Sequence, residues 1–110
     1  MYARMIQLTA KAGQEEGLSK VMKERALPIL KQQPGFVDAL ALTSDTEPNQ
    51  FVGITVWKSK EDADKYMSGQ ARQVLESIKP LLVAEPIFRT FNVEASIALS
   101  LGVDRAATSN

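Results

Sequence analysis

Two adjacent segments in the middle of this chain have strand character and are separated only by a short turn. The first, FVDALALT at residues 36–43, has the length of a β-strand. The second, FVGITVW at residues 51–57, is rich in β-branched and aromatic residues. The small polar residues between them, together with Pro48, indicate a turn. The two segments are therefore expected to pair as a β-hairpin, and the rest of the fold has to be built around it.

Helical patterns lie on both sides of this hairpin. Apolar residues recur at three- and four-residue intervals over residues 13–33, and Pro28 is expected to kink or end the regular part of that helix. Ser59 and Asp62 form an S-x-x-D capping box that starts a second helix. The Ser68–Gly69 pair interrupts this second pattern, so the helix is expected to be broken or to be two helices.

Strand-like segments stand near both ends of the chain. They are YARMIQLTA at residues 2–10 and PIFRTFNVE at residues 86–94, which complete the order β-α-β-β-α-β. This order predicts an α+β, ferredoxin-like fold, with a four-stranded antiparallel sheet and both helices on one face. Residues 1–94 are expected to form this domain. Residues 95–110 are expected to be an extension that contacts a partner through a strand and ends in a mobile tail.

The second face of this sheet is also predicted to be apolar. A sheet covered by helices on one face only should alternate apolar with polar residues. In residues 51–57 both alternating sets are largely apolar: Val52, Ile54 and Val56 form one, and Phe51, Gly53, Thr55 and Trp57 the other. A second copy of the same sheet is the simplest cover, so the sequence predicts a sheet-to-sheet homodimer that forms an α/β barrel.

Composition excludes several classes of function. The 13 basic and 13 acidic residues cancel, so neither nucleic acid nor an anionic membrane is expected as a partner. No apolar run reaches the roughly 20 residues of a membrane span, and the first residues lack the pattern of a signal peptide, so a cytoplasmic protein is expected. Cysteine and histidine are both absent, which excludes Ser-His-Asp and Cys-His catalysis within the chain and makes a metal site unexpected.

Five features then support a resemblance. They are the short strand leading to KAGQEE at residues 11–16, the Leu27-Pro28…Pro34-Gly35-Phe36 helix exit, the Trp57-x-Ser59-x-Glu61 junction, the Ser68-Gly69 interruption, and the final strand at residues 86–93. In order and spacing, residues 2–94 resemble the antibiotic biosynthesis monooxygenase domain of the dimeric α/β barrel superfamily. The resemblance implies dimerisation through the sheets. In the best-known members it implies oxidation of aromatic or quinol-type substrates by molecular oxygen, with no metal or flavin; other members degrade haem, and many have no assigned activity.

The resemblance also implies a pocket between sheet and helices, lined by a tryptophan at the end of the third strand, which Trp57 matches. The asparagine and the histidine of haem-degrading members align near Met5 and near Tyr66 or Met67, so haem is not expected. Gly53 stands where an aromatic-oxidising member has asparagine. The candidate pocket residues are Trp57, Tyr66, Met67, Gly53, Thr55, Met5 and Met22.

Each candidate has a purely structural alternative. Trp57 is either core or pocket wall, and Gly53 either leaves a gap for a flat ligand or marks a bulge or a tight contact with a helix. Tyr66 either binds a phenolic oxygen or lies half covered at the helix surface, and the methionines fill gaps in the core or contact the ligand.

Two arginines have alternative roles as well. Arg4 and Arg89 lie on strands that this topology makes neighbours. They either hold an anionic group of a ligand or pair with Asp38, Glu94 or solvent.

The leading functional hypothesis is a cofactor-independent monooxygenase that binds a small aromatic or quinol-type molecule and uses molecular oxygen as co-substrate. Without histidine its base would be a carboxylate, a tyrosine, a lysine or water, and no catalytic residue is assigned. The alternatives are a non-catalytic ligand-binding or stress-associated module of the same fold, and an isomerase or lyase built on the same barrel.

Overall fold

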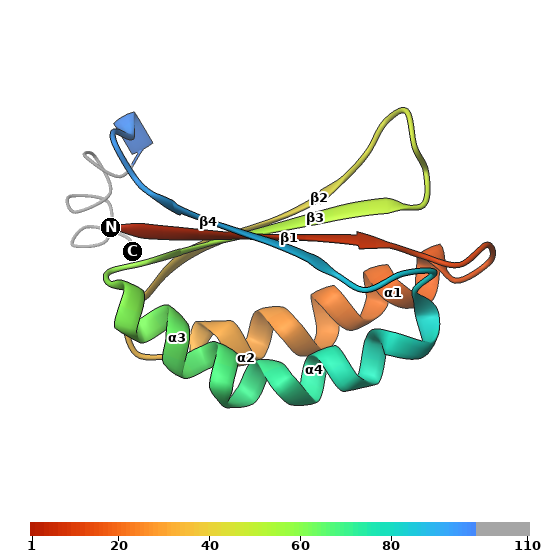
Figure 1. Ribbon diagram of the computed structural model, residues 1–110, viewed down its shortest axis with the longest axis horizontal. Coiled ribbons are helices and arrows are strands. Elements are labelled where there is room, and N and C mark those ends of the chain that lie inside the picture. The colour runs from red at the N-terminus through yellow and green to blue at the C-terminus, as the bar shows by residue number, and fades with distance from the viewer. Residues whose placement is uncertain (99–110) are drawn as a thin grey trace.

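Four antiparallel strands form one sheet, and the helices pack against one of its faces (Figure 1). The computed structural model describes residues 1–98. The strand order is β2-β3-β1-β4. The elements are β1 (Tyr2–Thr9), α1 (Glu15–Val21), the π-helical η1 (Met22–Ala26), α2 (Leu27–Lys31), β2 (Phe36–Thr43), β3 (Gln50–Trp57), α3 (Lys60–Ser68), α4 (Gln70–Ile78), the 3-10 helix η2 (Lys79–Leu81) and β4 (Ile87–Asn92).

The predicted α+β, ferredoxin-like fold is confirmed, with small differences at the strand ends. Ala10 forms an isolated bridge to Leu82 instead of extending β1. The last strand is shorter than predicted because it starts after Pro86, which has no N–H for a ladder, and ends at Asn92. Residues 99–110, which make up most of the expected extension, lie outside the described residues.

The first helical segment continues through Pro28 but changes its winding before it. Residues Met22–Ala26 form a π-helical turn, in which the N–H of Leu27 bonds the carbonyl of Met22. Pro28 has no N–H to offer the carbonyl of Glu24, and its ring crowds that carbonyl in a regular α-helix. The wider turn accommodates the proline, and the chain stays helical to Lys31.

The second helical segment begins as predicted. Ser59 is the N-cap of α3; its hydroxyl accepts a hydrogen bond from the Asp62 N–H at 3.2 Å and donates one to the Asp62 carboxylate at 2.9 Å. The segment is divided at Gly69, after which α4 starts. This capping places α3 directly after β3, so that its residues lie over the end of the sheet (Figure 1).

Strand alternation gives the sheet two different faces. On the face toward the helices, Leu8 and Trp57 are almost fully buried. On the opposite, outer face no described element covers the strands (Figure 1). Large apolar side chains that alternate onto this outer face are between 43% and 53% exposed: Leu40, Leu42, Ile87 and Phe91. The apolar outer face predicted from residues 51–57 therefore extends across the sheet.

Candidate functional site

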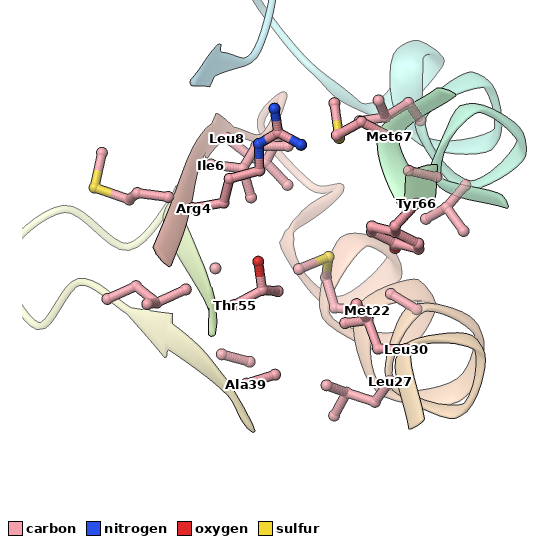
Figure 2. A pocket seen from close by; sticks show the side chains of 18 of the residues that line it. Arg4, Ile6, Leu8, Met22, Leu27, Leu30, Ala39, Thr55, Tyr66 and Met67 are labelled. Atoms are coloured by element: carbon pink, nitrogen blue, oxygen red, sulfur yellow. The ribbon is translucent and has the colours of Figure 1, made fainter. Parts of the chain in front are cut away.

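An apolar cavity of about 90 Å³ lies between the inner face of the sheet and the helices (Figure 2). All four strands supply one wall, β4 through Phe88 alone, and η1, α2, α3 and α4 supply the other. Aliphatic side chains and methionines make up most of both walls. A concave, mostly apolar space with few polar groups is the usual form of a site for a small organic ligand.

Three side chains bring polar groups to this cavity. Arg4 comes from β1, Thr55 from β3 and Tyr66 from α3 (Figure 2). Arg4 and Thr55 are cross-strand partners in the β1·β3 ladder, so their side chains stand side by side on the inner face. Polar groups from two layers of the fold therefore converge on one apolar space.

Trp57, at the end of β3, packs next to the cavity but does not line it. Its side chain is fully buried, and its indole N–H donates a 2.9 Å hydrogen bond to the hydroxyl of Thr55. Its ring packs against Tyr66, with the ring centroids 5.4 Å apart, and edge-on against Phe36. Trp57 thus contacts two of the three residues that carry the cavity's polar groups, without reaching the cavity itself.

The hydroxyls of Thr55 and Tyr66 have donor capacity to spare. The Thr55 oxygen accepts from Trp57, so its own proton points elsewhere, and within residues 1–98 neither this hydroxyl nor that of Tyr66 has a protein acceptor. Burial raises the pKa of Tyr66 above its ordinary value of 10.0, because the phenolate would lose its hydration. Tyr66 is therefore a neutral hydrogen-bond donor at physiological pH.

Arg4 joins the sheet to α3. Its guanidinium donates to the carbonyl of Ala63 at 3.0 Å and forms an ion pair with Asp64 at 3.2 Å. The sequence allowed Arg4 as an anion ligand or as a partner of Asp38, Glu94 or solvent. Asp64 could not be foreseen as its partner, since it is 60 residues away and comes near only through packing of α3. Arg89 lies opposite Met5 in the β1·β4 ladder and so belongs to the outer face.

Six of the seven predicted pocket residues border the cavity, and Trp57 is the exception. Gly53 lies on the inner face with Thr55, because both belong to the same alternating set of β3. Met22, Tyr66 and Met67 approach from the helices (Figure 2). Met5 also borders the cavity, but its side chain alternates onto the outer face, while its chain neighbours Arg4 and Ile6 lie on the inner face. Their role in contacting a ligand stays a prediction.

Side chains of two neighbouring residues pack closely against Gly53. A Cβ at this position would lie 3.1 Å from Cγ2 of Ile6 and 3.5 Å from Cε of Met22. The glycine therefore allows close packing of a strand neighbour and of η1, and it also borders the cavity; a gap for a flat ligand at this position stays a prediction. The flexible Met22 side chain is the part of this contact that can adapt to a ligand.

The chemistry that these residues offer is binding and orientation. Among the lining residues, all within residues 1–98, there is no carboxylate and no lysine, so no conventional general base faces the cavity. The same part of the chain contains no group of three or more acidic side chains arranged to hold a metal ion. None of its helices is long and apolar enough to cross a membrane.

The arrangement defines a small ferredoxin-like α+β protein with an apolar cavity between sheet and helices. A family model for antibiotic biosynthesis monooxygenases matches residues 1–76, and the chain belongs to this family. The resemblance found in the sequence is thereby confirmed. No curated protein sequence matches the chain.

Several solved structures have the same fold at low sequence identity. A protein of unknown function from Nitrosomonas europaea is 24% identical, with a TM-score of 0.77 over 86% of this chain and 90% of that one. SnoaB, a cofactor-independent oxygenase from Streptomyces nogalater, is 18% identical, with a TM-score of 0.76 over 87% and 95%. A conserved protein from Methanosarcina mazei Go1 is 12% identical, with a TM-score of 0.75 over 86% and 94%.

Proposed function

We propose that this chain is a cofactor-independent monooxygenase that binds a small aromatic or quinol-type substrate and oxidises it with molecular oxygen. Membership of the antibiotic biosynthesis monooxygenase family supports the reaction class, and SnoaB shows that a protein of this fold works without a cofactor. The proposal includes a homodimer formed through the outer sheet face and a cytoplasmic location, for which a chain without cysteine is suited.

The observation that carries the proposal is the apolar cavity with a few convergent donors. Its walls suit a flat apolar ring, while Thr55 and Tyr66 offer hydroxyl donors to oxygens on that ring. A cofactor-free oxygenase needs a substrate that itself supplies the electrons. The protein then contributes orientation, exclusion of water and stabilisation of charge, and the apolar walls and convergent polar groups of this cavity support that role.

The overall reaction balances for a hydroquinone. One oxygen atom of O₂ replaces a ring hydrogen as a hydroxyl, the quinol becomes a hydroxyquinone, and the second oxygen atom leaves as water. All four electrons that reduce O₂ come from the substrate. No protein group has to change its oxidation state, in keeping with a site that lacks cysteine and histidine.

Oxygen uptake tests this function directly. The protein is incubated with single-ring and fused-ring hydroquinones and with anthrones, and oxygen consumption is compared with that in buffer alone. We expect uptake above the buffer rate and one water formed for each oxygen atom inserted. Substrate loss equal to that in buffer, together with no measurable binding, would contradict the proposal.

A cavity-filling variant provides the matched control. Ala39 borders the cavity on β2 as the cross-strand partner of Thr55, so Ala39→Leu is expected to abolish uptake. Val37 lies on the same strand but does not border the cavity, so Val37→Leu should retain uptake.

The absence of a base among the lining residues keeps a non-catalytic binding module as the second candidate. Binding that is lost in Ala39→Leu, with no oxygen uptake by the original chain, would favour that candidate. Substrate conversion that proceeds equally without oxygen would instead indicate an isomerase or a lyase.

A further inference from the structure

Within residues 1–98, Arg4 is the single charged residue in the wall of the cavity, which is otherwise apolar but for Thr55 and Tyr66. Its side chain is 18% exposed, so most of it is withdrawn from water. A guanidinium carries five N–H donors, and the contacts to Ala63 and Asp64 use one N–H on each terminal nitrogen. Three N–H donors on a largely desolvated cation are therefore left for another partner.

The ion pair with Asp64 does not satisfy this charge fully. Asp64 is 49% exposed, its carboxylate lies 3.2 Å from one guanidinium nitrogen, and water screens such a pair. Among residues 1–98, the titratable groups at this region are Arg4 from β1, with Asp64 and Tyr66 from α3. A negatively charged ligand atom inside the cavity would be less exposed to water than the Asp64 carboxylate. Its attraction to Arg4 would therefore be stronger, because less water screens the two charges.

The size of the cavity restricts what can carry that charge. Its volume of about 90 Å³ is smaller than the roughly 150 Å³ of an apolar cavity known to accept benzene. One aromatic ring, with its oxygen directed toward Arg4, matches this space after small shifts of Met22 and Met67. A fused ring system is larger than this space, so it would have to displace more of the walls or extend out through the open side of the cavity.

We propose that Arg4 binds the ionised oxygen of the ligand, so that the cavity selects single-ring phenols and quinols in their oxyanion form. The single-ring aromatic character of the ligand rests on the proposed function. The selection of the anion also accounts for the lack of a lining base, because a substrate that enters as the oxyanion has already lost its proton. The oxyanion is also the electron-rich form that gives up electrons to oxygen most readily.

Binding of 4-nitrophenol tests this inference without any turnover. Its hydroxyl ionises near neutral pH, and its absorption spectrum distinguishes phenol from phenolate, so the ionisation state of the bound ligand can be read directly. We expect the phenolate to bind about 10- to 100-fold more tightly than the phenol, the range for a hydrogen bond to a charged group. The methyl ether 4-nitroanisole, which cannot ionise, should bind like the neutral phenol.

Three variants separate recognition from structural effects. Arg4→Met keeps an apolar stem and should remove the preference for phenolate while leaving nitroanisole binding unchanged. Asp64→Asn removes the competing carboxylate and should strengthen phenolate binding several-fold, the opposite direction from Arg4→Met. Arg72→Met deletes the same charge from an exposed position of α4 outside the cavity. It should change neither the preference for phenolate nor the affinity for nitroanisole.

The results distinguish this inference from the proposed function. Equal binding of phenol and phenolate, or a phenolate preference that survives in Arg4→Met, would overturn the inference even if quinols are oxidised. If Arg4→Met does not fold, unchanged or weaker phenolate binding in Asp64→Asn would overturn it. Arg4-dependent phenolate binding without oxygen uptake would leave it intact and reject the oxygenase. Tighter binding of 4-nitro-1-naphthol than of 4-nitrophenol would refute the limit to one ring.

Discussion

At the scale of single residues, Trp57 acts on the cavity from behind its wall. Its ring is fully buried, it contacts Tyr66, and its N–H holds the hydroxyl of Thr55. A residue that a ligand cannot touch is not a catalytic residue, but it fixes the positions of two residues that a ligand can touch. We therefore assign Trp57 a positioning role that is inseparable from its role in packing.

Trp57→Phe is expected to lower the free energy of unfolding by about 1–3 kcal/mol, because the smaller ring leaves unfilled space and the bond to Thr55 is lost. Thr55→Val should cost a similar amount, about 1–3 kcal/mol, because it leaves the buried indole N–H without an acceptor. Urea unfolding of both single variants and of the double variant measures how strongly the two residues are coupled.

Thr43→Val is the matched control for this pair, since it makes the same exchange at an exposed position of β2. Its free energy of unfolding should stay within about 0.5 kcal/mol of the original value. Unchanged stability in Trp57→Phe, combined with lost ligand binding, would show that Trp57 contacts the ligand after all and would refute the positioning role.

Tyr66 makes stability depend on pH in the alkaline range. Its pKa is raised by burial above 10.0, so between the ordinary and the raised value the unfolded chain has released this proton while the folded chain keeps it. The unfolded state then binds fewer protons, and the free energy of unfolding falls as the pH rises through this range. Below the ordinary value both states hold the proton, and Tyr66 adds no dependence on pH.

Urea unfolding on both sides of pH 10.0 measures this dependence. Tyr66→Phe removes the ionisable hydroxyl but keeps the ring against Trp57, so its stability should fall less steeply with pH than that of the original chain. Identical slopes for the two proteins would mean that Tyr66 ionises equally in both states, contrary to its burial.

At the scale of elements, Gly35 lies in the turn that connects α2 to β2, and it contacts α3. Its φ of +78° favours glycine, and a Cβ at this position would overlap the side chain of Asp62. Asp62 is the residue whose N–H and carboxylate complete the cap of α3 with Ser59. One glycine therefore permits both the turn into the sheet and the close approach of the capped helix.

Gly35→Ala is expected to destabilise the fold by more than the roughly 1–2 kcal/mol that a left-handed conformation costs other residues, since it also displaces the capping Asp62. Gly13 is the matched control: its φ is +85°, but a Cβ there would have no neighbour within 4 Å. Gly13→Ala should therefore show the conformational cost alone. Equal melting temperatures for the two variants would argue against the contact with Asp62.

At the scale of the whole molecule, the sequence predicts elements well because local chemistry determines them. The hairpin, the Ser59 cap and the break at Ser68–Gly69 follow from residue types at short spacing, and the structure confirms each of them. Pro28 was expected to kink or end a helix. The structure shows a π-helical turn instead of a termination, because packing of the helix against the sheet outweighs the lost hydrogen bond.

The site was harder to predict because it depends on contacts between distant segments. Strand alternation brings Thr55 and Arg4 to one face, but only the packing of α3 supplies Ala63 and Asp64 as partners for Arg4. The direction of the indole N–H of Trp57 depends on its side-chain rotamer, which no spacing pattern encodes. The sequence therefore indicated the correct segments but left Trp57 open between core and pocket wall, and its packing in the structure favours the core.

The outer sheet face leads to the last prediction. Its exposed apolar residues, Leu40, Leu42, Ile87 and Phe91, come from both edge strands, β2 and β4, and exposed apolar side chains gathered on one face favour association. Because each copy presents the same face, a two-fold dimer would bury both at once. Sedimentation of the original chain at micromolar concentration is expected to show a dimer. Leu42→Asp should shift it to a monomer, because the dimer would bury an unpaired carboxylate.

Val83→Asp is the control for this shift, since Val83 is 58% exposed but lies outside the strands. It places the same charge on an exposed apolar position and should leave the dimer intact. A monomeric original chain would refute the sheet-to-sheet dimer, and the apolar outer face would then require another partner. Oxygen uptake by the Leu42→Asp monomer at the rate of the dimer would show that the cavity, whose polar groups all come from one chain, works without the second copy.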